Sequence, residues 1–127
     1  MPVVSIKRPL AGTIYINDVF ELPTGLGFPP IIIGINFHPF FIRRNFTINA
    51  NATDAGCFGL AGVEFIIDST WQSTVFFSPP GALSYSWIWT IPPGFLITKT
   101  LTTIAYDNAG NSAADSISVR TLMIPWW

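Results

Sequence analysis

The strongest constraint on the fold is a strict alternation of apolar and polar side chains between Asn45 and Thr53. Every second position is apolar, with Asn or Thr between, and the apolar set is Phe46, Ile48, Ala50 and Ala52. Successive side chains of a β-strand point to opposite faces of a sheet, so this pattern predicts a strand with one buried face and one wet face. No stretch of useful length has apolar residues at helical spacing. The chain is therefore predicted to be all-β.

Short β-favouring runs recur along the chain and are separated by Pro, Gly, Asn and Asp. We predict strands at residues 12–17, 31–33, 45–53, 62–68, 71–77, 84–90, 97–106 and 112–120. Seven or eight strands in about 110 residues are typical of an immunoglobulin-like two-sheet sandwich. The expected core comprises Phe46, Ile48, Val63, Phe65, Ile67, Trp87 and Leu101. Both termini, 1–8 and 120–127, also resemble strands but have no obvious partner.

The low content of charged residues limits the classes of function. The chain has 127 residues, enough for one domain spanning 1–127, and 10% of them are charged, with a net charge of −1. An average soluble domain has about 25% charged residues. We therefore expect neighbouring subunits, glycans or both to cover the surface. Six scattered Lys and Arg residues are too few for nucleic-acid binding, and one cysteine, Cys57, excludes an internal disulfide.

A long uncharged stretch, residues 22–42, has the length of a membrane span and is followed by Arg43 and Arg44. It contains four prolines and three glycines, which a spanning helix would not tolerate. Two short strands joined by a proline-rich loop are expected instead, with no membrane span.

Several segments resemble a known family. The runs NATDAG (51–56), GVEFIID (62–68), SYSWIWT (84–90) and LTTIAYDNAGNSAADSISV (101–119) are similar to immunoglobulin-like domains of bacterial and archaeal surface proteins. The resemblance covers about 45–119, and the segment 1–44 precedes it. The closing hairpin is the most specific part, whereas the low surface charge and residues 36–44 depart from the family. The resemblance implies an extracellular or cell-surface module with a structural or adhesive role and no enzyme chemistry.

The segment Asp107-Asn-Ala-Gly-Asn111 is read as the turn of a hairpin, because Asp and Asn side chains bond to nearby backbone and Gly110 accepts positive φ. Calcium binding is the alternative. In an immunoglobulin-like topology the loops after Asp54 and Asp107 lie at the same end of the sandwich. Asp54, Asp107, Asn108 and Asn111 would then supply oxygen ligands. No other cofactor is expected.

Other candidate sites are weaker. His38 is the only histidine and lies in an apolar run, so neither a catalytic triad nor a zinc site is recognisable, and an enzyme is not predicted. Tyr85, Trp87 and Trp89 share one face of a strand, either as core, as a sugar-stacking platform or as a subunit interface. Asn45 and Asn51 begin N-x-Thr sequons, which predict either glycosylation or unmodified asparagines.

These observations predict a non-catalytic extracellular structural protein, the subunit of a homopolymeric filament or surface layer. The mode of assembly would be strand donation, in which Val4 and Ile6 of the N-terminal segment enter the groove of a neighbour. The plainer alternative is that this segment pairs within its own domain. Two other functions stay open: a spacer or adhesion domain of a larger surface protein, and a carbohydrate-binding module.

Overall fold

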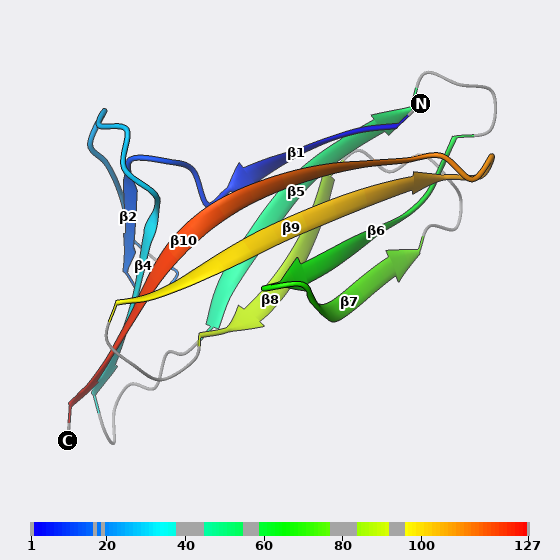
Figure 1. Cartoon of the computed structure of the whole chain (residues 1–127). Coiled ribbons are helices and arrows are strands. Elements are labelled where there is room, and N and C mark those ends of the chain that lie inside the picture. Colours follow the sequence, from blue (N-terminus) through cyan, green and yellow to red (C-terminus); the bar gives the residue numbers. More distant parts are fainter. Residues whose placement is uncertain are drawn as a thin grey trace. The chain divides into compact units, whose positions relative to one another are not determined.

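The computed structural model describes residues 2–16, 18, 20–37, 45–54, 59–76, 84–91 and 96–126. Every regular element in these ranges is a β-strand, as Figure 1 shows. The strands are β1 (Pro2–Arg8), β2 (Thr13–Ile16), β3 (Phe20–Pro23), β4 (Ile31–Phe37), β5 (Asn45–Asp54), β6 (Leu60–Ile67), β7 (Thr70–Phe76), β8 (Ser84–Thr90), β9 (Ile97–Asp107) and β10 (Ser112–Trp126). The all-β class predicted from the sequence is confirmed.

Hydrogen bonding joins these strands into two sheets. One sheet has the order β1-β5-β8, and the other has the order β3-β2-β4-β10-β9-β6-β7. The described ranges thus hold two strands more than the eight that were predicted, and the additional strands are β1 and β3. Strand β3 was missed because all four of its residues are exposed and it therefore has no buried phase. The two-sheet architecture itself is confirmed.

Both strand-like termini find partners inside the chain. Strand β1 pairs antiparallel with β5, with Val4 opposite Ala52 and Ile6 opposite Ala50. The C-terminal segment continues β10 and pairs in parallel with β4, from Arg120 opposite Ile31 onward. Of the two short strands expected within residues 22–42, β4 lies inside that stretch, whereas residues 38–42 lie outside the described residues and β3 overlaps the stretch only at its last two residues.

The chain divides into two compact units. Unit 1 comprises Met1–Arg8, Asn49–Trp87 and Thr100–Ile117, and unit 2 comprises Pro9–Ile48, Ile88–Lys99 and Ser118–Trp127. Strands β5, β8, β9 and β10 contribute to both.

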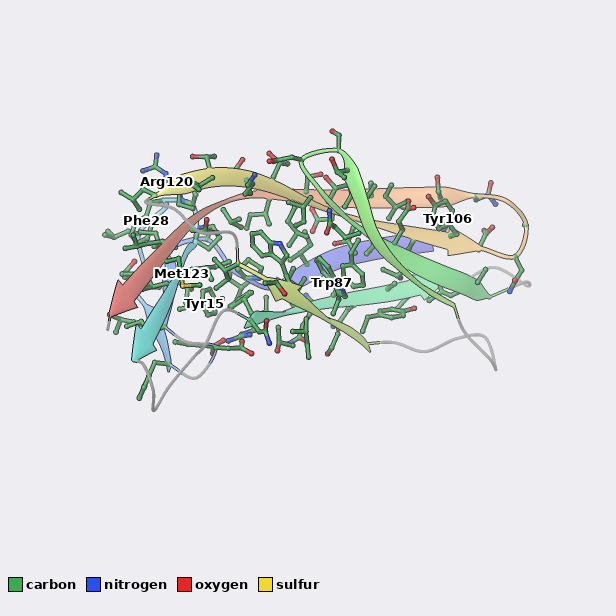
Figure 2. All side chains as sticks on the ribbon, turned by 90° about the horizontal axis from the view of Figure 1, so that it is seen from below. Tyr15, Phe28, Trp87, Tyr106, Arg120 and Met123 are labelled. Carbon is green, nitrogen blue, oxygen red and sulfur yellow. The ribbon has the colours of Figure 1, made fainter. Side chains whose placement is uncertain are left out.

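The core of unit 1 lies between its two sheets. Val63 and Phe65 of β6 are fully buried, as is Ala105 of β9. Phe65 stacks on Trp87 of β8 with ring centroids 5.6 Å apart, and Figure 2 shows Trp87 among the interior side chains. Removing a buried ring such as that of Phe65 costs about 3–5 kcal/mol, because a cavity adds to the lost burial.

The hairpin of β6 and β7 turns through two residues with positive φ, Asp68 at 51° and Ser69 at 66°. A two-residue turn of this kind follows the right-handed twist of the strands it joins. The Asp68 carboxylate accepts a hydrogen bond from the Thr100 amide at 2.7 Å, and the Asp68 amide donates to the Thr100 carbonyl at 2.8 Å. The turn is therefore attached to strand β9 as well.

The core of unit 2 is also built from both sheets. Tyr15 of β2 packs edge-on against Phe46 of β5, with ring centroids 4.9 Å apart. The Tyr15 hydroxyl accepts a hydrogen bond from the Leu10 amide at 2.8 Å, which satisfies the polar end of a side chain that is 2% exposed. Ile32 and Ile48 are also buried in this unit.

Most of the predicted core is confirmed. Phe46, Ile48, Val63, Phe65, Ile67 and Leu101 are all buried, and Trp87 is half-buried. The alternation of apolar and polar residues along the strands therefore identified correctly which side chains point into the core.

The loop 24–30 of unit 2 is held against Gly12. The Gly12 amide donates to the Phe28 carbonyl at 2.7 Å, and the Thr24 amide donates to the Gly12 carbonyl at 2.9 Å. Gly12 has φ +73°, and a Cβ at this position would overlap the carbonyl oxygen of Leu26. Only glycine fits here without displacement of the loop backbone.

The described residues contain no helix that is long and apolar enough to cross a membrane.

Candidate functional site

The loop between β9 and β10 is organised around the Asp107 carboxylate. Its Oδ1 accepts hydrogen bonds from the amides of Ala109 at 2.9 Å and Asn111 at 2.8 Å, and its Oδ2 accepts one from the Asn111 side chain at 3.0 Å. Gly110 takes φ +90°, as the turn requires. The segment is thus a hairpin turn stabilised by its own acidic residue, as the first of the two interpretations predicted.

The Asp107 carboxylate is buried and is held in its charged form by its hydrogen bonds. The side chain of Asp107 is 6% exposed. Hydrogen bonding from the Asn111 side chain, with further bonds from the Asn111 and Ala109 amides, holds the pKa of Asp107 below its ordinary value of 3.8. Asn108 faces the other way: its amide and its side chain both donate to the Gly59 carbonyl, at 3.1 Å and 3.3 Å. Asn108 thus ties the turn to the start of β6.

The calcium interpretation needs Asp54 beside this loop. The C-terminal ends of β5 and β9 both point toward the side where the amino terminus lies in Figure 1. Asp54 pairs through its backbone with Pro2, while its side chain lies outside what the structure describes. Within the described residues no three His, Cys, Asp or Glu side chains gather into a metal-binding group. The calcium site at Asp54, Asp107, Asn108 and Asn111 stays a prediction.

Three other carboxylates, those of Asp18, Glu64 and Asp115, also hold backbone or hydroxyl groups in place. Asp115 of β10 accepts a hydrogen bond from the Ile6 amide of β1 at 2.8 Å. Asp18 accepts from both the amide and the hydroxyl of Thr47, at 3.0 Å and 2.7 Å. Glu64 accepts from the Tyr106 hydroxyl at 2.8 Å, and this bond raises the pKa of Tyr106. These side chains connect segments that are distant in the sequence.

The aromatic face of β8 belongs to the core. Tyr85 is 4% exposed and Trp89 is 5% exposed, and half-buried Trp87 stacks on Phe65. Burial raises the pKa of Tyr85 to about 12. A sugar-stacking platform needs exposed rings, so these three side chains do not form one.

The sequons lie on the polar face of β5, as predicted from the alternation. Asn45 is exposed and accepts a 3.4 Å hydrogen bond from the Thr90 hydroxyl, and Asn51 is half-buried opposite Ser5 of β1. Whether either asparagine carries a glycan stays a prediction. His38 and Cys57 lie outside the described residues.

The predicted assembly residues lie in β1. Val4 and Ile6 are each 8% exposed and pack within unit 1, where β1 pairs with β5 of the same chain. In this chain the N-terminal segment therefore fills its own sheet, which was the plainer of the two alternatives.

The sequence reasoning missed a pocket in unit 2. It is lined by Phe28, Pro29, Ile31 and Arg120 and has a volume of about 210 Å³. Its residues come from the proline-rich loop, the start of β4 and the middle of β10. No local pattern brings these positions together, because the parallel pairing of Arg120 with Ile31 unites segments almost 90 residues apart in the sequence.

A scan of protein-family models and a search of curated proteins found no match. Solved structures do resemble the chain. Fibronectin(III)-like modules of CbhA from Clostridium thermocellum match with a TM-score of 0.54 and 15% identity over 98% of this chain and 100% of that one. The fold is immunoglobulin-like.

An engineered protein gives a similar match, with a TM-score of 0.51 and 18% identity over 95% of this chain and 20% of its own length. Identities at this level show the fold alone. The predicted immunoglobulin-like sandwich is confirmed, and the resemblance to surface-protein domains of bacteria and archaea stays a prediction.

Proposed function

We propose that this chain is a non-catalytic immunoglobulin-like module that acts outside the cell as a structural unit. The observation that carries the proposal is the use of its carboxylates. Asp18, Asp68, Asp107 and Asp115 each accept a hydrogen bond from a backbone amide. A general acid or base must exchange protons with a substrate, whereas these groups are committed to the fold. Structural neighbours that are fibronectin(III)-like modules support the same conclusion.

A homopolymeric filament or surface layer is the form of structural role that we favour. Its support is the apolar surface of unit 2, where large side chains are 43–68% exposed; they are Leu10, Phe20, Leu22, Leu26, Ile88 and Leu96. With 10% charged residues, the chain has few charged groups to keep a monomer with such a surface in solution. Contact with further copies would cover it. A spacer or adhesion domain of a larger surface protein is the alternative.

Strand donation takes a definite form in this fold. Because β1 occupies its own sheet, donation becomes an exchange in which β1 of one copy pairs with β5 of the next. Val4 and Ile6 would keep the same surroundings, so the exchange costs little once the chain segment after Arg8 has opened. The contact is head-to-tail and propagates as a filament.

The test is a disulfide placed across the β1–β5 pair. Val3 is exposed and lies opposite Thr53, which is also exposed. Val3→Cys with Thr53→Cys, in a Cys57→Ser background, is oxidised after assembly and run on a non-reducing denaturing gel. Exchange produces a ladder of covalent oligomers, because each bridge joins two copies.

The other outcomes are equally informative. Filaments in electron micrographs together with a single-chain band reject exchange of β1 but retain the homopolymer. A protein that stays monomeric at high concentration rejects the homopolymer and favours the spacer alternative.

A further inference from the structure

The pocket of unit 2 plays no part in the structural role proposed above. Three of its described lining residues are apolar, namely Phe28, Pro29 and Ile31, and Arg120 is the charged one. Figure 2 shows the Phe28 and Arg120 side chains close together. Phe28 and Ile31 are half-buried, and Arg120 is exposed, so the pocket is open to ligands from solvent.

The backbone holds this pocket in shape before any ligand arrives. The Phe28 carbonyl accepts the Gly12 amide at 2.7 Å, and the Pro30 carbonyl accepts the Arg120 amide at 3.0 Å. Ile31 lies between Ile14 of β2 and Arg120 of β10 in the sheet. A ligand would therefore meet a wall that is already ordered, which lowers the entropic cost of binding.

The charge at the pocket is not matched by a described carboxylate of the same chain. Asp18, Glu64, Asp68, Asp107 and Asp115 accept the hydrogen bonds described above, and Glu21 also has a partner of its own. A guanidinium presents a planar set of donors that suits a carboxylate. The complementary anion would come from another molecule.

The size of the pocket limits the apolar part of that molecule. Pockets for drug-sized ligands have volumes of about 300–1,000 Å³, and this one has about 210 Å³. It therefore accommodates a single ring or branched side chain. We propose that the pocket binds a small organic anion in which one flat apolar group carries a carboxylate, with the ring against Phe28 and Ile31 and the carboxylate on Arg120.

Phenylacetate is the probe that tests this site. Titration into the ¹⁵N-labelled full chain should shift the amide signals of Phe28, Ile31 and Arg120, with a dissociation constant in the millimolar range expected for so few ligand atoms. Arg120→Gln should weaken binding about fivefold, the factor expected for one solvent-exposed ion pair. Lys7→Gln removes a positive charge from an exposed position in unit 1 and should leave the affinity unchanged.

A change on the ligand side tests the same contact without altering the protein. Phenylacetamide keeps the ring and loses the charge, so it should bind the unaltered chain about fivefold more weakly than phenylacetate does. The Arg120→Gln variant should bind phenylacetamide and phenylacetate with equal affinity. Equal weakening by Lys7→Gln and Arg120→Gln would overturn the proposal, because it would show attraction to net charge. Signal changes confined to other parts of the chain, or none at all, would overturn it too. None of these results bears on assembly.

Discussion

At the residue scale, polar groups decide where the chain is stabilised and where it is not. The Asp107 carboxylate accepts three hydrogen bonds inside its own turn, whereas the Thr103 hydroxyl is buried without any hydrogen-bond partner in the described structure. The two residues lie on the same strand, β9, and in the same inward phase. Polar burial is favourable only where a partner is supplied.

Replacing Thr103 by an apolar residue of the same shape should raise the stability of the fold. The residue is 0% exposed and lies opposite Phe65 in the sheet. Thr103→Val keeps the shape and removes the unpaired hydroxyl, so the free energy of unfolding should rise by about 1 kcal/mol in urea denaturation. Thr103→Ser is the matched control: it keeps the hydroxyl and deletes a methyl group, and should lower stability by about 1 kcal/mol. A loss with valine would show that the hydroxyl has a partner, such as a buried water.

Asp107 should make stability depend on acid pH. Its pKa is lower in the folded chain than the ordinary 3.8, chiefly because of the Asn111 side chain. A carboxyl with a lowered folded pKa contributes stability that is fully present above the unfolded value and is lost as pH falls through the folded one. Unfolding free energies measured between about pH 6 and about pH 2 should therefore fall less in Asp107→Asn than in the unaltered chain. Parallel pH profiles for the two proteins would contradict this.

At the element scale, the loop 24–30 shows how one glycine positions a segment. Two glycines of this region have nearly the same φ, Gly12 at +73° and Gly25 at +75°, but different surroundings. Gly12 lies against the Leu26 carbonyl, whereas a Cβ at Gly25 would have no described atom within 4 Å apart from those of its chain neighbours. Substitutions at these two glycines therefore distinguish the stability lost through the backbone conformation from the stability lost through a steric overlap.

We expect Gly25→Ala to lower the free energy of unfolding by about 1 kcal/mol, which is the cost of an L residue in the left-handed region. Gly12→Ala should cost about 3 kcal/mol or more, because the added methyl group must also displace the loop backbone. Chemical denaturation of both variants measures the difference. If the two costs are equal, the loop adjusts freely and does not hold the pocket wall in place.

At the scale of the whole molecule, apolar exposure is unevenly distributed. The described part of unit 2 has six large exposed apolar side chains, and the corresponding set in the described part of unit 1 is Val3 and Tyr106. Strand β3 exposes Phe20 and Leu22 but also has Glu21 and Pro23, which are residues that discourage edge pairing. Packing of these exposed side chains against another copy is therefore better supported than strand pairing between copies at the edge strand β3.

Replacing Phe20 and Leu22 together by Thr should reduce self-association, because both side chains are more than half exposed and their removal lowers the apolar area available for contact. Sedimentation velocity over a concentration series measures the change. Val3→Thr in unit 1 is the control and should have little effect, although Val3 is 62% exposed. Equal effects from both changes would show that assembly follows total apolar exposure and not the surface of unit 2.

The sequence by itself determined most of the strands, which of their side chains point into the core, and the hairpin turn at Asp107, because these depend on side-chain alternation and on turn residues within a few positions of one another. Only the tertiary structure decided which strands pair. It placed β1 beside β5, β10 beside β4 and the missed strand β3 at a sheet edge. The pocket at Arg120 follows from those pairings, and local patterns carry no information about them, because sheet partners come from any distance along the chain.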